Sequence, residues 1–153
     1  MNIDWTKLLL GFAGRTGKRD FWLGFAALFG AGIVANLLPL IGPFASLALI
    51  WPWTALLAKR LHDIGKSGWL VLIPAAPAAL SAVLTLMMAL AMANPATMGA
   101  AFAAGAIAVL VSTFAMLVGL CFLLWVGLKP GEAGANAWGD PVPVQANMAS
   151  KVA

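Results

Sequence analysis

Two long uncharged stretches separate short charged clusters along this chain. Residues 21–58 form 38 consecutive positions without a charge, and residues 67–128 form a second uncharged run of 62. A helix rises about 1.5 Å per residue, so about 20 apolar residues cross a hydrocarbon core of about 30 Å. The first stretch therefore predicts two short membrane-spanning helices, and the second stretch predicts two more.

Each stretch contains a central break that divides it. Residues 39–43 and residues 94–99 both carry proline and glycine, which interrupt helices. Strands are not expected, because an open sheet edge leaves backbone groups unsatisfied in lipid. The fold class predicted is an all-α membrane protein, a four-transmembrane-helix bundle. Its parts are an amphipathic N-terminal segment at 1–20, helices at 21–41, 43–58, 69–93 and 101–128, and a Gly/Pro-rich tail at 129–153.

The basic residues predict the orientation of this bundle. All of them fall before the first helix, between the second and third, or after the fourth, and the two opposite loops carry no charge. Basic loops stay on the cytoplasmic side, beside an anionic leaflet. Both termini are therefore expected in the cytoplasm. The nine basic residues are Lys7, Arg15, Lys18, Arg19, Lys59, Arg60, Lys66, Lys129 and Lys151.

Composition excludes several classes of protein. The chain is 63% hydrophobic and 9% charged, whereas soluble domains carry about 25% charged residues. The net charge of +4 does not form a polar basic face, so no nucleic-acid partner is expected. A single cysteine, Cys121, builds neither a disulfide framework nor a thiolate metal site. No signal peptide is recognised at the N-terminus, and no cofactor or metal is expected.

The densest polar segment, residues 58–69, has a structural interpretation. If the second helix continues into it, Asp63 lies one turn from Lys59 and Arg60 and pairs with either, while Gly65 suits a helix C-terminus. The alternative is functional: a site for a lipid headgroup or another anion. It would be formed by Arg60, His62, Lys66 and the free amides at residues 65–69.

Three enzyme-like patterns in this segment are incomplete. The pair His62-Asp63 is typical of metal phosphohydrolases, but those sites need further histidines and the chain has one. The run Gly65-Lys66-Ser67 matches the end of a phosphate-binding loop, yet Arg60 stands where its first glycine is required. Ser67, His62 and Asp63 are too close in sequence for an obvious catalytic triad. General acid or base chemistry by His62 stays open.

Three blocks of the sequence resemble the family labelled domain of unknown function 805. That resemblance implies a small multi-pass protein of a bacterial inner membrane and no established activity. Lys59 and Trp138 are mild departures, since the family often has arginine and tyrosine there. The blocks are Gly14-Arg15 with Arg19 and Phe21-Trp22; Lys59 through Trp69; and Lys129-Pro130-Gly131 through Gly134, Asn136, Trp138-Gly139 and Pro141.

All three blocks map to the cytoplasmic side, so they are expected to meet in one layer. Arg15 or Arg19 should lie near the tail, and Arg60 near Asp63 or Asp140. The leading hypothesis is a non-enzymatic module whose layer binds anionic membrane lipids, a membrane-protein partner or a second copy of the chain. A lipid-headgroup enzyme using His62 and Asp63, or a small-solute channel lined by Ser81, Thr85, Ser112 and Thr113, are the alternatives. The candidate binding residues are Arg15, Arg19, Arg60, His62, Asp63, Lys66, Ser67, Trp69, Asn136 and Asp140.

Overall fold

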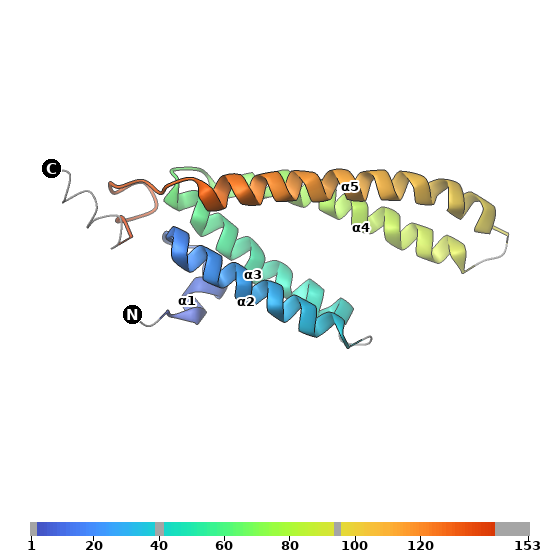
Figure 1. The fold of residues 1–153 in the computed structure, drawn as a ribbon, viewed down its shortest axis with the longest axis horizontal. Helices are drawn as coiled ribbons and strands as arrows, with labels where there is room; N and C mark the ends of the chain where they lie inside the picture. Colours follow the sequence, from blue (N-terminus) through green and yellow to red (C-terminus); the bar gives the residue numbers. More distant parts are fainter. Residues whose placement is uncertain (1–2, 39–41, 94–95, 143–153) are drawn as a thin grey trace. The chain divides into compact units, whose positions relative to one another are not determined.

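A computed structural model describes residues 3–38, 42–93 and 96–142, and its regular structure is helical (Figure 1). Within these ranges, extended pairing is limited to one isolated bridge between Asn136 and Gly139. The predicted all-α class is therefore confirmed. The helices are α1 (Trp5–Leu10), α2 (Lys18–Asn36), α3 (Gly42–Asp63), the 3-10 helix η1 (Gly68–Val71), α4 (Leu72–Met92) and α5 (Met98–Leu128).

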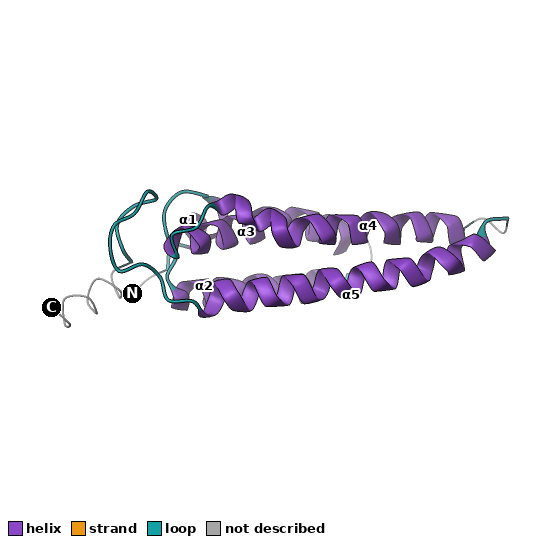
Figure 2. Cartoon of the chain, turned by 90° about the horizontal axis from the view of Figure 1, so that it is seen from above, coloured by secondary structure: helices purple, strands orange, loops and turns teal. Residues whose placement is uncertain are grey.

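The chain divides into two compact units. Unit 1 comprises Met1–Val71 and Trp125–Ala153, and unit 2 comprises Leu72–Leu124. In unit 1, α2 and α3 run side by side in opposite directions, and α1 packs against α3 (Figures 1 and 2). The side chains buried in unit 1 include Phe21, Leu28, Leu56, Leu61 and Val126. These residues come from the two sequence-distant parts of unit 1, so its core requires the C-terminal end of α5.

The second helix is longer than the sequence interpretation proposed. It was expected to end at Ala58, but α3 continues to Asp63. Its end is a Schellman motif, in which the Lys66 amide donates to the Leu61 carbonyl at 2.8 Å and the Gly65 amide donates to the His62 carbonyl at 3.2 Å. Gly65 has φ of +71°, the left-handed conformation that this motif needs. The polar residues after Ala58 are thereby held in a helical turn.

The other helix ends also differ from the expected positions. α2 begins at Lys18 rather than at residue 21, and Asp20 in its first turn complements the helix dipole. It ends at Asn36, and residues 39–41 of the predicted span lie outside the described residues. The third predicted helix opens as the 3-10 turn η1 before α4 begins at Leu72. α5 begins at Met98 rather than at residue 101. Residues 96–101 contain no proline, so nothing in this segment prevents the helix from starting earlier.

Unit 2 consists of α4 and most of α5. A polar contact between side chains joins the two helices, and further hydroxyl groups bind carbonyls of their own helix. The hydroxyl groups of Ser81 and Ser112 lie 2.7 Å apart. Thr85 donates to the Ser81 carbonyl at 2.8 Å, and Thr113 donates to the Val109 carbonyl at 2.9 Å. Each of these four hydroxyls is therefore satisfied within the hairpin.

Among the residues that the structure describes, two segments are long and apolar enough to cross a membrane. They are Gly68–Met92 and Met98–Leu128, with mean hydropathy of 2.1 and 2.7 in their most apolar windows. Only 6% and 11% of those windows is buried within the protein, whereas the core helix of a soluble protein is mostly buried. These two helices therefore suggest a membrane location. The four-span arrangement stays a prediction.

Candidate functional site

Three buried charged side chains form an arginine–aspartate cluster in unit 1: Arg15, Arg60 and Asp63. Arg15 donates from Nε to Asp63 Oδ1 at 3.2 Å, and Arg60 donates from Nη1 to Asp63 Oδ2. The three side chains are 1%, 0% and 0% exposed. Arg60 and Asp63 are one helical turn apart on α3, which places them on the same face. A single carboxylate thus lies between two guanidinium groups.

Arg60 also binds backbone carbonyls from two other segments of unit 1. Its Nε donates to the Val126 carbonyl at 3.1 Å, and its Nη1 donates to the Thr16 carbonyl at 3.4 Å. Its Nη2 donates to the Lys129 carbonyl. The rigid fork of five donors lets one arginine hold the turn before α2 and the end of α5 against α3.

Arg15 binds the tail in the same way. It donates from Nη1 to the Gly134 carbonyl at 2.7 Å and from Nη2 to the Glu132 carbonyl. In return, the Glu132 amide donates to the Asp63 carbonyl at 2.8 Å. The prediction that the three blocks meet in one layer is confirmed. Of the two arginines predicted to lie near the tail, Arg15 and Arg19, it is Arg15 that binds it.

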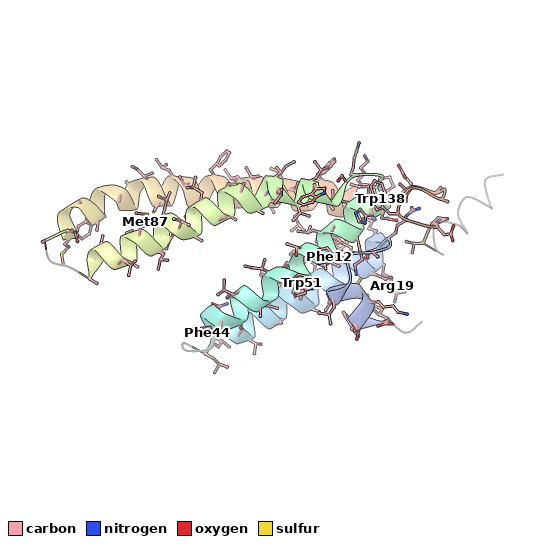
Figure 3. The ribbon with its side chains drawn as sticks, turned by 180° about the vertical axis from the view of Figure 1, so that it is seen from behind. Phe12, Arg19, Phe44, Trp51, Met87 and Trp138 are labelled. Atoms are coloured by element: carbon pink, nitrogen blue, oxygen red, sulfur yellow. The ribbon has the colours of Figure 1, made fainter. Side chains whose placement is uncertain are left out.

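His62 lies beside the cluster and contacts the tail from the other side. Its ring stacks on Trp138 with centroids 4.8 Å apart and planes 8° apart, and Trp138 is labelled near the end of α3 in Figure 3. The His62 Nδ1 lies 3.3 Å from the Gly14 carbonyl, and Asn136 donates to the His62 carbonyl at 2.9 Å. Burial lowers the pKa of His62, while the contact with Gly14 partly raises it. The imidazole is therefore chiefly a neutral packing group at neutral pH.

The remaining predicted residues lie on the surface of the layer. Arg19 is exposed in the first turn of α2, and Lys66 and Ser67 are exposed in the loop after α3. Trp69 is 79% exposed in η1, and Asp140 is exposed in the tail. Arg60 pairs with Asp63, the first of its two predicted partners. The five exposed side chains can reach an external ligand, whereas the buried cluster cannot. They are Arg19, Lys66, Ser67, Trp69 and Asp140.

Sequence reasoning did not single out Glu132, which supports the layer. A Cβ atom on Gly65 would lie 1.9 Å from Glu132 Oε1, so the tail carboxylate sits directly over this glycine. Glu132 Oε2 also accepts a hydrogen bond from Asn136 at 2.8 Å. The only signal for Glu132 was its position just after Lys129-Pro130-Gly131, as the one acidic residue in the sequence between Lys129 and Gly139.

The cluster is a buried network of ion pairs and hydrogen bonds. An arginine guanidinium stays charged in proteins, and each of the two oxygens of the Asp63 carboxylate accepts a hydrogen bond from one of them. In the described ranges, no group of three His, Cys, Asp or Glu side chains could hold a metal ion.

Comparison with known proteins places this geometry in a family. Residues 9–140 match the family described as "Protein of unknown function (DUF805)". The chain belongs to this family. The DUF805 match includes the whole arginine–aspartate cluster and the tail segment that it binds. No solved structure shows significant similarity to the chain.

Two curated relatives are similar to part of this DUF805 protein. Both are called "Uncharacterized protein YiiR", one from Escherichia coli strain K12 and one from Escherichia coli O157:H7. Each is 40% identical over 67 residues, which cover 39% of this chain. The match spans about half the length of these relatives, 46% in each case.

Proposed function

We propose that this protein spans a bacterial inner membrane four times, with both termini in the cytoplasm, and that its cytoplasmic layer binds anionic lipid headgroups without catalysing a reaction. The observation that carries the proposal is a division of charge. The buried charges of the cluster are paired with one another and with backbone carbonyls, whereas exposed cations surround them on the same end of unit 1.

The apolar surface of α2 and α3 supports the two additional spans. Residues 21–58 carry no charge, and the large side chains Phe29, Val34, Phe44 and Leu47 are at least 57% exposed. A surface of this kind is unfavourable in water and suits lipid. The uncharged part of each helix, residues 21–36 of α2 and residues 42–58 of α3, is shorter than the about 20 residues of a typical span. Local thinning of the bilayer accommodates the difference.

The exposed cations support lipid binding at the cytoplasmic end. Lys18, Arg19 and Lys66 are exposed beside the cluster, and Trp69 projects from η1 next to Lys66. Tryptophan is enriched at headgroup depth, and each basic residue near an anionic surface contributes about 1 kcal/mol. This combination of a protruding indole and exposed cations matches an anionic interface.

The contacts favour this reading over the alternatives of an enzyme and a channel. Asp63 is saturated by two arginines, and His62 is stacked on Trp138. The hydroxyls of Ser81 and Ser112 bind each other, which is the use expected of polar groups between helices in lipid. A membrane-protein partner or a second copy of the chain would be seen as an outcome of the experiments below.

Labelling of single cysteines tests the four-span topology. With Cys121 replaced by alanine, Leu38→Cys should react in intact cells with a membrane-impermeant thiol reagent, because residue 38 follows α2 on the periplasmic side. Ser67→Cys should react only in inverted vesicles, and Gly99→Cys should behave like Leu38→Cys. Protection of Leu38→Cys in intact cells, with labelling of Gly99→Cys, would leave two spans and disprove the proposed four.

Retention of lipid tests the binding role. We expect the Lys18→Gln/Arg19→Gln/Lys66→Gln variant to retain at least tenfold less phosphatidylglycerol than the unaltered protein by native mass spectrometry, because about three favourable charge interactions are lost. The matched control, Lys18→Arg/Lys66→Arg, keeps the charges and should retain lipid normally. Unchanged retention in the glutamine variant would refute lipid binding. Loss of a co-purifying protein or of a dimer instead would point to a protein partner.

A further inference from the structure

A pocket beside the arginine–aspartate cluster has no role in the layer described so far. It lies within unit 1 and has a volume of about 250 Å³. Its walls come from α1, the turn before α2, the start of α2 and the end of α3. Five charged residues line it, Asp4, Lys7, Arg15, Asp20 and Lys59, together with the apolar Leu8 and Val142. Arg15 is already paired with Asp63, outside the pocket lining, and so leaves the other four charges to a ligand.

One carboxylate oxygen in this pocket receives no hydrogen bond from the described residues. Asp20 Oδ1 is buried and accepts no hydrogen bond from the described residues. Leaving a buried charged acceptor unsatisfied costs more than about 1–3 kcal/mol. The first turn of α2 provides a favourable dipole but no donor to this oxygen. Asp20 is therefore suited to a donor that comes from outside the chain, such as an ammonium group.

A buried lysine lines the same pocket. Lys59 is only 3% exposed, and its Nζ donates to the carbonyls of Lys7 and Leu8. An ammonium group has three donors, so one is left for a ligand. Burial lowers the pKa of Lys59, and an anion in the pocket would offset that effect. Lys7, whose side chain is 87% exposed, adds a second cation at the rim.

The balance of charge selects the class of ligand. Lys59 and Lys7 would attract a phosphate, but Asp20 and Asp4 would repel a ligand that carries only negative charge. The two lysines would likewise repel a simple cation. A ligand with a phosphate at one end and an ammonium at the other satisfies both kinds of charge. Its phosphate would face the two lysines, and its ammonium would face the two aspartates. The volume is smaller than the roughly 300–1,000 Å³ of sites for whole drug-sized ligands, which suits a headgroup.

The surroundings of α1 place this pocket at the depth of lipid headgroups. Trp5 and Leu10 of α1 are 46% and 56% exposed, and Phe12 is 38% exposed. Phe12 and Trp51 meet edge to face at 5.0 Å (Figure 3), and the Trp51 indole donates to the Leu10 carbonyl at 3.1 Å. A short helix with exposed aromatic and aliphatic side chains is suited to lie in the membrane interface.

We propose that this pocket binds a phosphoethanolamine group, with its ammonium on Asp20 and its phosphate on Lys59 and Lys7. The ligand is either the headgroup of a phosphatidylethanolamine lipid or a free phosphoethanolamine. The inference rests on the membrane location proposed above, but it does not depend on Lys18, Arg19 or Lys66.

Short-chain lipids test the site on the purified full-length protein in detergent. We expect dihexanoyl phosphatidylethanolamine to bind about tenfold more tightly than dihexanoyl phosphatidylcholine, whose trimethylammonium cannot donate a hydrogen bond to Asp20. Asp20→Asn should abolish this preference, because it removes the charged acceptor. Asp140→Asn, which removes an exposed carboxylate outside the pocket, should leave the preference unchanged. The readout is a ratio of two affinities, so a general loss of folding does not imitate the result.

The outcomes separate this site from the proposed lipid-binding layer. Equal affinity for the two lipids, or a preference that survives Asp20→Asn, would overturn the inference and leave a pocket that holds only water. Displacement of the lipid by free phosphoethanolamine at similar concentration would identify a soluble ligand, whereas weak displacement would identify the lipid. The Lys18→Gln/Arg19→Gln/Lys66→Gln variant should lose phosphatidylglycerol but keep the preference for phosphatidylethanolamine.

Discussion

Asp63→Asn is expected to lower the free energy of unfolding by about 3–5 kcal/mol, the usual effect of removing one partner from a buried ion pair. The substitution keeps the shape of the side chain but leaves Arg15 and Arg60 buried without a counter-ion. Both arginines also hold the tail carbonyls, so the tail should become accessible to protease. Thermal unfolding in detergent and limited proteolysis of residues 129–142 measure the two effects.

The chain offers a matched control in its exposed ion pair. Asp4 lies 3.4 Å from Lys7, and the two side chains are 52% and 87% exposed. Asp4→Asn makes the same chemical change in solvent and should destabilise the protein far less than Asp63→Asn, because solvent screens an exposed pair. Asparagine can still cap α1, so the helix start is preserved. If Asp63→Asn and Asp4→Asn destabilise the protein equally, the cluster contributes no more than a surface pair.

Gly127→Ala is expected to have the second-largest effect, a loss of about 1–3 kcal/mol from overpacking. A Cβ at this position would lie 2.6 Å from Trp22 Cζ2 and 3.1 Å from Phe21 Cε1. Both neighbours are rigid rings, and the Trp22 indole donates to the Gly127 carbonyl at 3.2 Å. The start of α2 would therefore have to move away from α5. Thermal unfolding and the emission wavelength of Trp22 would report the change.

Gly119→Ala provides the control for Gly127→Ala on the same helix. No atom of the described residues comes within 4 Å of a Cβ built on Gly119, so this substitution should stabilise the helix by up to about 1 kcal/mol. A double-mutant cycle with Trp22→Leu should recover part of the loss at Gly127. Destabilisation of similar size at both glycines would contradict the packing argument.

The helices could be predicted because charge and chain length limit them directly. A long uncharged run that contains prolines near its middle has few alternatives to a helical hairpin. The end of α3 was less predictable. Residues 59–63 are polar, so hydropathy placed them in a loop, while the Schellman motif at Gly65 extends the helix through them. Local backbone capping outweighed the change in polarity.

Which residues form the arginine–aspartate cluster could be predicted only in part, because their positions depend on segments of the chain without regular structure. The shared side of the three blocks that resemble the family indicated that Arg15 or Arg19 would approach the tail, and that Arg60 would approach Asp63 or Asp140. The choice depends on the paths of residues 11–17 and 129–139, which follow no helical or strand period. Arg15 precedes α2 and turns inward to Asp63, whereas Arg19 lies in the first turn of α2 and is exposed.

The sequence by itself determined the helical class, the family and the side of the chain on which charges gather, because these follow from composition, uncharged runs and short motifs. Only the tertiary structure decided which of those charges are buried in the cluster and which stay exposed, and that Asp20 and Lys59 share a pocket. The physical reason is that burial and pairing are properties of groups brought together from distant segments. The spacing of Arg60 and Asp63 along α3 already predicted their contact, whereas Arg15 and Glu132 become their neighbours only through the fold of unit 1.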